Sequence, residues 1–414
     1  MISSRPTRRL AIGLILLSAA FCAEAFDVRV EGLEGEVRDN VKAMLTLVRE
    51  RSTTTIRQTY RAQTDRAVRA GLEALGHYRS DIRYDWTEPK KEGEEPLLTV
   101  RITAGPRVKV RKTELTLRGE AADDPAFQEL SGGFPPEGTL LNHGDYDAFK
   151  GTVERTAIRR GFFDGHFLRA ELGIDPLVDA SDWIFEYDGG VRYRFGEMTI
   201  EGSQIREPIL RGILPFKPGD PYSSDDITEW NQRLNATGWF NSVVVSPDIA
   251  AGKRSESKTL PVKTRVSPKR GNQVETGLGY STDVGPRGQL KWTKPWINDS
   301  GHSISAATEL STLEQSADLS YKIPLEENAL EHYWLLQTGY KHEDLNDTLS
   351  KGATVRASRY WAPYEGWQKS LSLTWSLNDF TQGLDDYKTT LIYPSATISR
   401  TRSRGGLMPR WGES

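Results

Sequence analysis

The sequence predicts three tandem α+β repeats followed by an antiparallel β-sheet within one chain of 414 residues. Two observations predict this fold class. Helix-patterned stretches end in a glycine and two ring residues at Gly76-His77-Tyr78, Gly161-Phe162-Phe163 and Gly238-Trp239-Phe240, which lie about 80 residues apart and indicate one repeated unit. Beyond residue 268 the helical period disappears, and apolar and polar residues alternate as they do in strands that bury one face.

The first repeat, residues 26–104, is expected to fold in the order β-α-α-β-β. An apolar stripe at helical spacing follows a short strand at 26–30. Thr64 is the candidate N-cap of the second helix, and Gly76 fits the left-handed position that ends it. Two further strands are expected, at 80–86 and 97–103.

The same order is expected in a second repeat, residues 105–189, and a third, residues 190–268. Gly161 and Gly238 end the long helices, and the rings after each glycine are expected to fill the layer between helix and sheet rather than to contact a ligand. The free edges of such small sheets could pair with an extended segment of another chain. The candidate N-caps are Asp145, Ser223 or Ser224, and the strands after the glycines are 167–174 and 243–249.

The alternation after residue 268 predicts about eight strands. They are 274–281, 289–293, 303–310, 317–323, 333–340, 353–360, 371–377 and 389–398. A one-sided sheet in a soluble protein alternates in the same way. The export signal described below and the late tryptophans favour a transmembrane barrel, because indole rings collect at the lipid–water boundary. These tryptophans are Trp292, Trp296, Trp334, Trp361, Trp367, Trp375 and Trp411.

The amino terminus has the pattern of a cleaved signal peptide, residues 1–25. Arg5, Arg8 and Arg9 precede an apolar run that is too short to span a bilayer, and Ala23-Glu24-Ala25 offers small residues for cleavage. Removing three arginines and one glutamate changes the net charge from −3 to −5, which argues against a nucleic-acid partner. The only cysteine, Cys22, lies in this segment, so the mature chain has no disulfide or thiolate metal site.

Catalytic and metal motifs are absent from the sequence, so we expect neither an enzyme nor a cofactor nor a metal site. The six histidines show no ligand spacing, and no nucleophile elbow or phosphate loop is present. The acidic group Glu343, Asp344, Asn346 and Asp347 lacks the spacing of a calcium loop and is expected to be a solvated hairpin tip. Arg400, Arg402 and Arg404 could meet lipid phosphates, but a solvated loop is the simpler interpretation.

Several stretches resemble outer-membrane assembly factors that carry polypeptide-transport-associated (POTRA) repeats, and within them the TamA family of the translocation and assembly module. The resemblance extends along the whole chain, and its most specific stretches are 193–196, 201–205, 234–243 and 275–287. It implies POTRA 1 at 26–104, POTRA 2 at 105–189, POTRA 3 at 190–268 and the N-terminal part of a transmembrane β-barrel at 269–414. It also implies an outer-membrane location with the arm in the periplasm.

The resemblance implies a function that makes no covalent bond. Strands of unfolded outer-membrane and autotransporter clients would enter the lipid by pairing at a weak seam beside the first barrel strand. The expected seam residues are Val274, Thr276, Gly277, Leu278, Gly279 and Tyr280. Gly277 and Gly279 would weaken that strand, or they would only allow the barrel to bend. A TamB-type subunit anchored in the inner membrane is the implied periplasmic partner, chiefly through the first repeat.

The sequence departs from the family in strand number, because the family's barrels have roughly twice as many strands as the eight expected here. Half a sheet leaves edges that lipid does not tolerate, so we expect these residues to be the amino-terminal part of a longer protein. Two other classes remain open. A two-partner secretion pore exports one dedicated protein but usually has two repeats and a plug helix, and a soluble periplasmic binding module would keep residues 269–414 in water.

Overall fold

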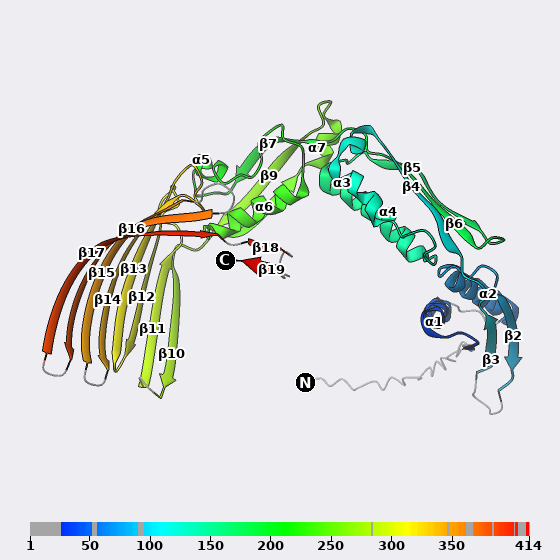
Figure 1. Cartoon of the computed structure of the whole chain (residues 1–414), viewed down its shortest axis with the longest axis horizontal. Helices are drawn as coiled ribbons and strands as arrows, with labels where there is room; N and C mark the ends of the chain where they lie inside the picture. The colour runs from blue at the N-terminus through cyan, green and yellow to red at the C-terminus, as the bar shows by residue number, and fades with distance from the viewer. Residues whose placement is uncertain are drawn as a thin grey trace, which may run out of the picture. The chain divides into compact units, whose positions relative to one another are not determined.

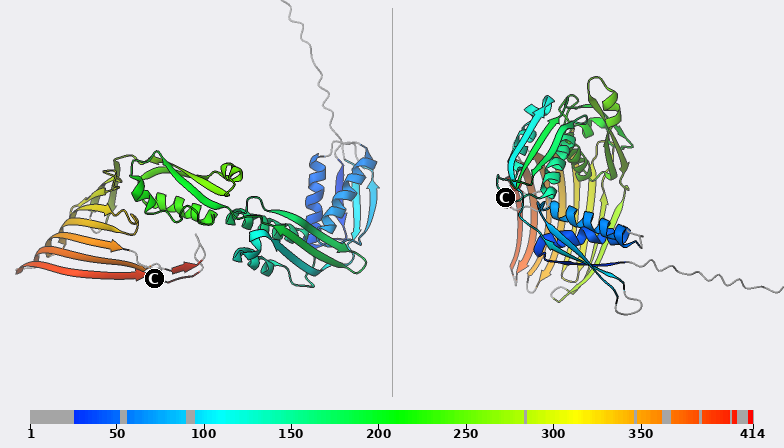
Figure 2. Two further views of the ribbon diagram at one scale, coloured as in Figure 1. Left: turned by 90° about the horizontal axis from the view of Figure 1, so that it is seen from above. Right: turned by 90° about the vertical axis from the view of Figure 1, so that its right-hand side faces the viewer.

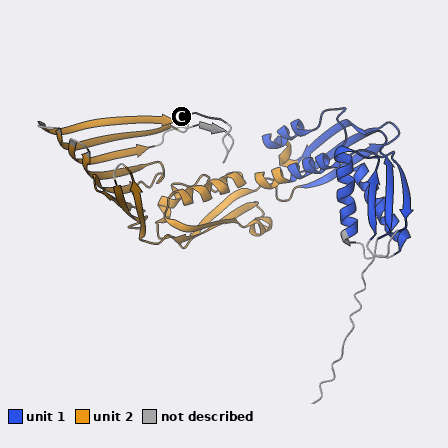
Figure 3. Ribbon diagram, turned by 90° about the horizontal axis from the view of Figure 1, so that it is seen from below, with its two compact units in different colours: residues 1–118, 123–154, 166–188 blue, residues 119–122, 155–165, 189–414 orange. Residues whose placement is uncertain are grey.

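The computed structural model describes residues 26–51, 56–89, 95–282, 285–345, 348–361, 367–382, 385–400, 402–404 and 411–413. These ranges contain three three-stranded sheets, one eight-stranded sheet and one short strand pair (Figure 1). The chain divides into two compact units, which Figure 3 shows in blue and orange. The predicted signal peptide and Cys22 lie outside the described residues. Within the described ranges, no helix combines the length and apolar character needed to cross a membrane.

The first repeat has the predicted β-α-α-β-β order. Strand β3 is central, parallel to β1 and antiparallel to β2. Val41 and Val68 on the two helices pack with Leu98 and Val100 of β3 in one buried cluster, because the apolar stripe of each helix faces the sheet. The elements are β1 (Asp27–Glu31), α1 (Gly35–Arg51), α2 (Arg57–Glu73), β2 (Asp81–Thr87) and β3 (Leu97–Thr103).

Two of the predicted helix caps are wrong. Helix α2 begins at Arg57, so Thr64 lies buried near its middle instead of capping it, and its hydroxyl has no hydrogen-bond partner. Helix α4 (His143–Arg160) begins two residues before Asp145, and Asn142 caps it by accepting a hydrogen bond from the Gly144 N–H at 2.8 Å. The first error placed the helix start about two turns late, since Ile56 precedes α2 without a side-chain cap. The second arises because several polar residues near the start of α4 can serve as a cap.

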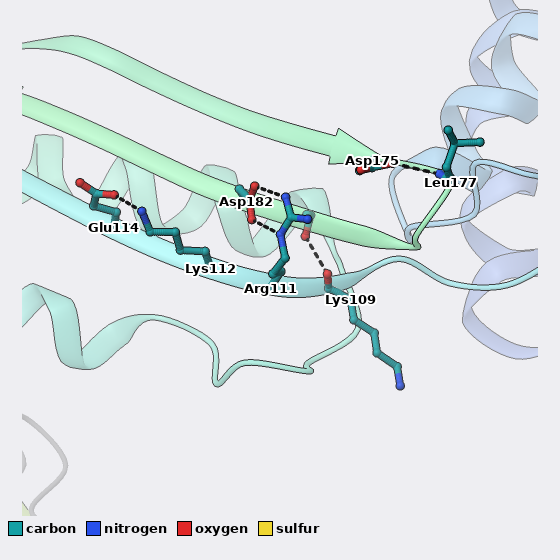
Figure 4. Close-up of polar contacts among 8 residues, drawn as sticks. Lys109, Arg111, Lys112, Glu114, Asp175, Leu177 and Asp182 are labelled. Atoms are coloured by element: carbon teal, nitrogen blue, oxygen red, sulfur yellow. Dashed lines mark hydrogen bonds and ion pairs between the residues drawn. The ribbon is translucent and has the colours of Figure 1, made fainter.

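The second repeat has the same sheet topology, with β6 between β4 and β5. Its solvent face carries cross-strand ion pairs, and Figure 4 shows Arg111 against Asp182, with Nε 2.9 Å from Oδ1, beside Lys112 and Glu114. Two 3₁₀ segments, 119–123 and 129–133, flank a helix of only four residues. The remaining elements are β4 (Lys109–Arg118), α3 (Pro125–Gln128), β5 (His166–Asp175) and β6 (Ala180–Asp188).

The third repeat again has its last strand in the centre, in the order β7-β9-β8. Ser223, one of the two predicted candidates, is the N-cap of α6. It accepts a hydrogen bond from the Asp225 N–H at 3.1 Å. The strand predicted at 243–249 begins and ends earlier, because Asp248 caps a short helix that starts at Ile249. The elements are β7 (Arg194–Glu201), α5 (Glu207–Arg211), α6 (Ser224–Ala236), β8 (Phe240–Pro247), α7 (Ile249–Arg254) and β9 (Thr259–Pro268).

Consecutive repeats are joined by an arginine that recurs at the same place. Arg107 donates from Nε to the Leu75 carbonyl at 2.7 Å and from Nη2 to the Leu141 carbonyl at 3.2 Å. In the next joint Arg192 makes the equivalent pair of bonds, to the carbonyls of Arg160 at 2.8 Å and Tyr222 at 3.0 Å. Each guanidinium therefore satisfies carbonyls beside the end of one helix and before the start of another, which a lysine could not reach together.

The ring residues after the repeat glycines also reach these joints. The Tyr78 hydroxyl lies 2.6 Å from Nε2 of His143, which begins the long helix of the second repeat. Phe163 packs edge-on against Tyr193, with ring centroids 5.3 Å apart. The expectation that these rings only fill the layer between helix and sheet is therefore incomplete, because they also fix where the next repeat begins.

Eight strands between residues 273 and 400 form one antiparallel sheet in which each strand pairs with the next, which confirms the eight predicted strands (Figure 2). Register places Trp292, Ala306 and Leu319 on one face, and Lys291, Ala307 and Asp318 on the other. The second face carries a groove of 720 Å³ lined mainly by serine, threonine and charged side chains. The strands are β10 (Gln273–Ser281), β11 (Gly285–Lys294), β12 (Ser303–Ser311), β13 (Glu314–Pro324), β14 (Tyr333–Leu345), β15 (Thr348–Trp361), β16 (Trp367–Gln382) and β17 (Asp385–Arg400).

Candidate functional site at the first edge of the large sheet

Strand β10 is an edge strand, and it follows the third repeat after four connecting residues. It pairs with β11 over all nine of its residues, and no strand within the described ranges pairs with its other side. In an antiparallel ladder, alternate residues direct their N–H and C=O groups to opposite sides. About half of the peptide groups of β10 therefore face outward and could receive another strand.

The six predicted seam residues lie on this strand in strict alternation. Val274, Leu278 and Tyr280 share one face with Thr276 and are 62%, 95% and 78% exposed. Gly277 and Gly279 share the opposite face, which continues through register into the polar groove. The strand thus presents a mainly apolar row on one face, while its other face carries polar side chains at residues 273, 275 and 281 and none at the two glycines.

The two glycines are not forced by backbone conformation, since neither has a positive φ. A Cβ at Gly277 would make only ordinary contacts, 3.8 Å from Cβ of Gln289, whereas one at Gly279 would lie 3.2 Å from Nε of the flexible Arg287 side chain. Packing against β11 therefore leaves room for a side chain at residue 277. What glycine does at this position is lower the intrinsic stability of the strand.

Charged residues of the sheet face near β10 are paired with the neighbouring strand. Glu275 lies 3.7 Å from Nζ of Lys291, and Arg287 lies 3.8 Å from Glu309. Both pairs are largely exposed, so each contributes little to stability. Both pairs lie within the sheet, so what β10 offers to another strand is chiefly its outward peptide groups and its apolar row.

The start of β10 and the residues that lead into it, 269–276, are called its root, and they are hydrogen-bonded to the third repeat. The Lys269 N–H donates to the Trp239 carbonyl at 2.9 Å, and Trp296, which follows β11, donates from Nε1 to the Lys269 carbonyl at 2.9 Å. The Trp239 indole is 3% exposed and donates to the Gly301 carbonyl at 3.0 Å. The turn between β11 and β12 is therefore bonded to the same residue that holds the start of β10.

A second turn of the sheet also enters the third repeat. Ala329, between β13 and β14, is 2% exposed within the core cluster of that repeat, and Leu330 packs against the cluster. A Cβ added to Gly212 at the end of α5 would lie 2.0 Å from the Glu326 carbonyl oxygen, which shows how closely the backbones approach. Sequence patterns had placed these turns only as connections between strands.

Other candidate residues from the sequence do not gather into a site. Glu343 and Asp344 lie on β14 while Asn346 and Asp347 fall outside the described residues, and no cluster of metal-ligating side chains occurs in the described ranges. Trp296 packs on the core of the third repeat, so its assignment to a lipid-facing girdle is wrong. Arg400 ends β17, with its guanidinium 5.4 Å from the Trp367 ring centre.

The six edge strands of the small sheets differ in regularity. Register shifts interrupt both edge strands of the second repeat and both edge strands of the third. In the first repeat, β1 and β2 pair with β3 without any interruption. Bulges twist an edge away from further pairing, so the first repeat carries the most regular edges of the three.

Comparison with protein families identifies two of the repeats. Residues 27–104 match the family described as POTRA domain TamA domain 1, and residues 193–269 match the POTRA family described as surface antigen variable number repeat. The first and third repeats are therefore POTRA domains. The second has the same sheet topology.

Comparison with solved structures extends to the large sheet. BamA from Haemophilus ducreyi lacking POTRA domains 1–3 is 14% identical with a TM-score of 0.56, covering 73% of this chain and 61% of that one. CdiB from Escherichia coli is 13% identical with a TM-score of 0.40, over 91% of this chain and 66% of that one. The first likeness shows the fold: small α+β domains followed by an antiparallel barrel sheet, here open. The chain spans 61% of the length of that BamA structure.

Proposed function

We propose that this chain is the POTRA arm and leading barrel strands of an outer-membrane assembly factor, which promotes insertion of β-barrel and autotransporter proteins. The observation that carries the proposal is β10, an exposed, glycine-containing edge strand that directly follows a POTRA domain. In lipid every peptide group must be paired within a structure. An edge that lends its N–H and C=O groups to an incoming strand lowers the cost of entry for that strand.

The seam residues of this proposal are Val274, Thr276, Gly277, Leu278, Gly279 and Tyr280. Pairing uses main-chain groups and therefore accepts many sequences, while the exposed apolar row of β10 favours clients whose strands alternate in the same way. Strand pairing at the seam exchanges one set of hydrogen bonds for another, so it requires neither cofactor nor catalytic residue. The location that fits is the outer membrane, with its lipid around the sheet and the arm in the periplasm.

The arm contributes sites for a periplasmic partner. We assign the first repeat to contact with a TamB-type subunit, because β1 and β2 are uninterrupted edges whereas both edges of the other repeats are bulged. A segment added beside β2 would pair with the free side of that strand and so extend the sheet in which β2 already pairs with β3. The regular edges support this assignment of the partner to the first repeat.

The test of the proposal is the outer-membrane proteome of a strain depleted of the complete protein. We expect several barrels and autotransporters to fall together and to recover when the gene is restored. Loss of one exported protein, with all barrels unchanged, would instead identify a two-partner secretion pore. Unchanged levels of every outer-membrane protein, or recovery of residues 269–414 in the aqueous fraction without detergent, would contradict both.

A further inference from the structure

We propose that Trp239 is a positioning residue that preorganises the root of β10, so that an incoming strand pairs first at Val274–Thr276 and then extends toward Tyr280. This inference rests on the proposed function and adds a direction to it. It follows from a contrast along the nine residues of one strand. The root is bonded to the third repeat, and the other end contains two glycines and the most exposed side chain.

The bonds at the root converge on Trp239 from three sides. Its carbonyl accepts hydrogen bonds from the Lys269 N–H at 2.9 Å and from Nε2 of Gln204 at 3.0 Å. Its indole N–H donates to the Gly301 carbonyl at 3.0 Å. One residue thus holds the residue that leads into β10 through its main-chain carbonyl, and the turn that follows β11 through its side chain.

Two further tryptophans complete the root on the large sheet. Trp296 donates from Nε1 to the Lys269 carbonyl at 2.9 Å, so the N–H and the C=O of Lys269 are both hydrogen-bonded. Trp292, opposite Val274 in the ladder, donates from Nε1 to Oδ1 of Asn272 at 3.1 Å. Arg206 joins the turn to the third repeat, with its N–H 2.9 Å from the Asp299 carbonyl and Nη2 2.7 Å from the Ser300 hydroxyl.

Residues 277–279 of β10 carry little side-chain packing. Leu278 is 95% exposed, and the glycines on either side of it have no side chain to pack on β11. A template strand that is already ordered loses less conformational entropy on pairing than one that must be ordered first. The first contacts of an incoming strand therefore form at the root, and the glycine half is ordered as pairing proceeds.

The chain offers a clean way to test this order, because its only cysteine, Cys22, lies in the predicted signal peptide. The complete protein, with any cysteine beyond residue 414 replaced by serine, is prepared in proteoliposomes with one introduced cysteine, either V274C or Y280C, on the same exposed face of β10. A barrel client with one cysteine in its terminal strand is added, and disulfide formation is followed in time. We expect cross-links at residue 274 to precede those at residue 280.

Trp239→Phe then separates positioning from folding. It removes the indole N–H, and we expect the initial rate of cross-linking at residue 274 to fall by roughly three- to tenfold, the factor that one ordinary hydrogen bond corresponds to. Trp230→Phe is the matched control, since it removes a buried indole bond to Oγ1 of Thr264 at 3.0 Å in the same repeat but away from the root. That control is expected to leave the order and the rate at residue 274 unchanged.

Cross-links that form first at residue 280, or together at both positions, would overturn the inference while leaving seam pairing intact. Equal slowing by Trp239→Phe and Trp230→Phe would overturn the positioning role, since general damage to the repeat would then explain it. Absence of cross-links at both positions, with the client inserted normally, would contradict the proposed function itself.

Discussion

The Trp239 indole donates a hydrogen bond to the Gly301 carbonyl at 3.0 Å, and its ring occupies the space that a side chain at residue 301 would need. A Cβ built on Gly301 would lie 2.3 Å from Cζ2 of that ring, and Gly301 has a φ of +74°. Glycine is required here both by backbone conformation and by the close approach of the ring. The contact joins the third repeat to the sheet through one turn.

Replacing Gly301 by alanine should therefore loosen this contact. Left-handed strain and the overlap with Trp239 together should cost roughly 2–4 kcal/mol. The lost stability is measured by urea unfolding of the purified protein in detergent, with protease resistance of the third repeat as the readout. Gly271→Ala is the control, because a Cβ at residue 271 would meet nothing within 4 Å beyond its chain neighbours and the residue has no positive φ. Equal stability of the two variants would contradict the described packing.

Gly161 and Gly238 occupy the same place in successive repeats but should respond differently to alanine. Both have positive φ values, +87° and +71°. A Cβ on Gly161 would lie 2.9 Å from Cβ of Tyr222, while one on Gly238 would meet nothing within 4 Å. We expect about 1–2 kcal/mol of destabilisation at 238 from strain alone, and about 1–3 kcal/mol more at 161.

Urea denaturation of the isolated arm, residues 26–268, tests this difference. Gly238→Asn is a useful third variant, since asparagine tolerates the left-handed region better than other residues with a side chain. It should retain nearly all of the stability of the native arm. A Gly161→Ala variant no less stable than Gly238→Ala would show that the contact with Tyr222 adjusts without cost.

The joint between the first two repeats should make the stability of the arm depend on pH. Burial raises the pKa of Tyr78 to about 12, so its phenol stays protonated where it shares a hydrogen bond with Nε2 of His143. Burial lowers the pKa of His143, partly offset by Asp147 and Glu73. The unfolded chain therefore binds a proton more readily than the folded one, and stability is lost as pH falls below about 6.5.

The free energy of unfolding of the arm should be greater at pH 7.5 than at pH 5.5, and His143→Gln should reduce that difference. His77 acts in the same direction, since burial lowers its pKa as well, so some dependence should remain. His166→Gln, at an exposed position on β5, is the control. An unchanged slope in His143→Gln would show that the Tyr78–His143 contact is not the source.

Gly277→Val should strengthen β10 and weaken the proposed function. Register and spacing leave room for a side chain at residue 277, and valine favours a strand over glycine by up to about 1 kcal/mol. We expect unaltered folding and slower insertion of a barrel client into proteoliposomes. Gly288→Val on the fully paired neighbour β11 also has room, with Leu278 3.7 Å away, and should leave insertion unchanged. Equal rates in all three proteins would contradict a role for strand weakness.

Proline at adjacent positions can distinguish the two sides of β10. Thr276 and Gly277 direct their N–H groups to opposite sides of the strand, so one of them donates to β11 and the other faces the open edge. Thr276→Pro and Gly277→Pro should therefore differ. One variant should fold normally and insert clients poorly, because only an outward donor is lost, and the other should lose stability. Two variants that both fold and insert normally would contradict pairing along this edge.

Much of the fold could be predicted from the sequence because it depends on local periodicity. The three repeats, the change from helical spacing to alternation and all eight strands follow from where apolar residues recur along the chain. Two caps were wrong. Thr64 failed because α2 starts about two turns earlier, after Ile56, without a side-chain cap, and Asp145 failed because the folded backbone places Asn142 within reach of the Gly144 N–H instead. The seam residues on β10 stay a prediction.

The sequence by itself determined the three repeats, the eight strands of the large sheet and the glycines of β10, because those properties follow from composition and spacing. Only the tertiary structure decided that Trp239 meets Gly301, that Ala329 enters the core of the third repeat and that bulges spare the first repeat. These contacts join residues tens of positions apart. Which side chain fills a distant gap depends on packing in three dimensions, and no local pattern records it.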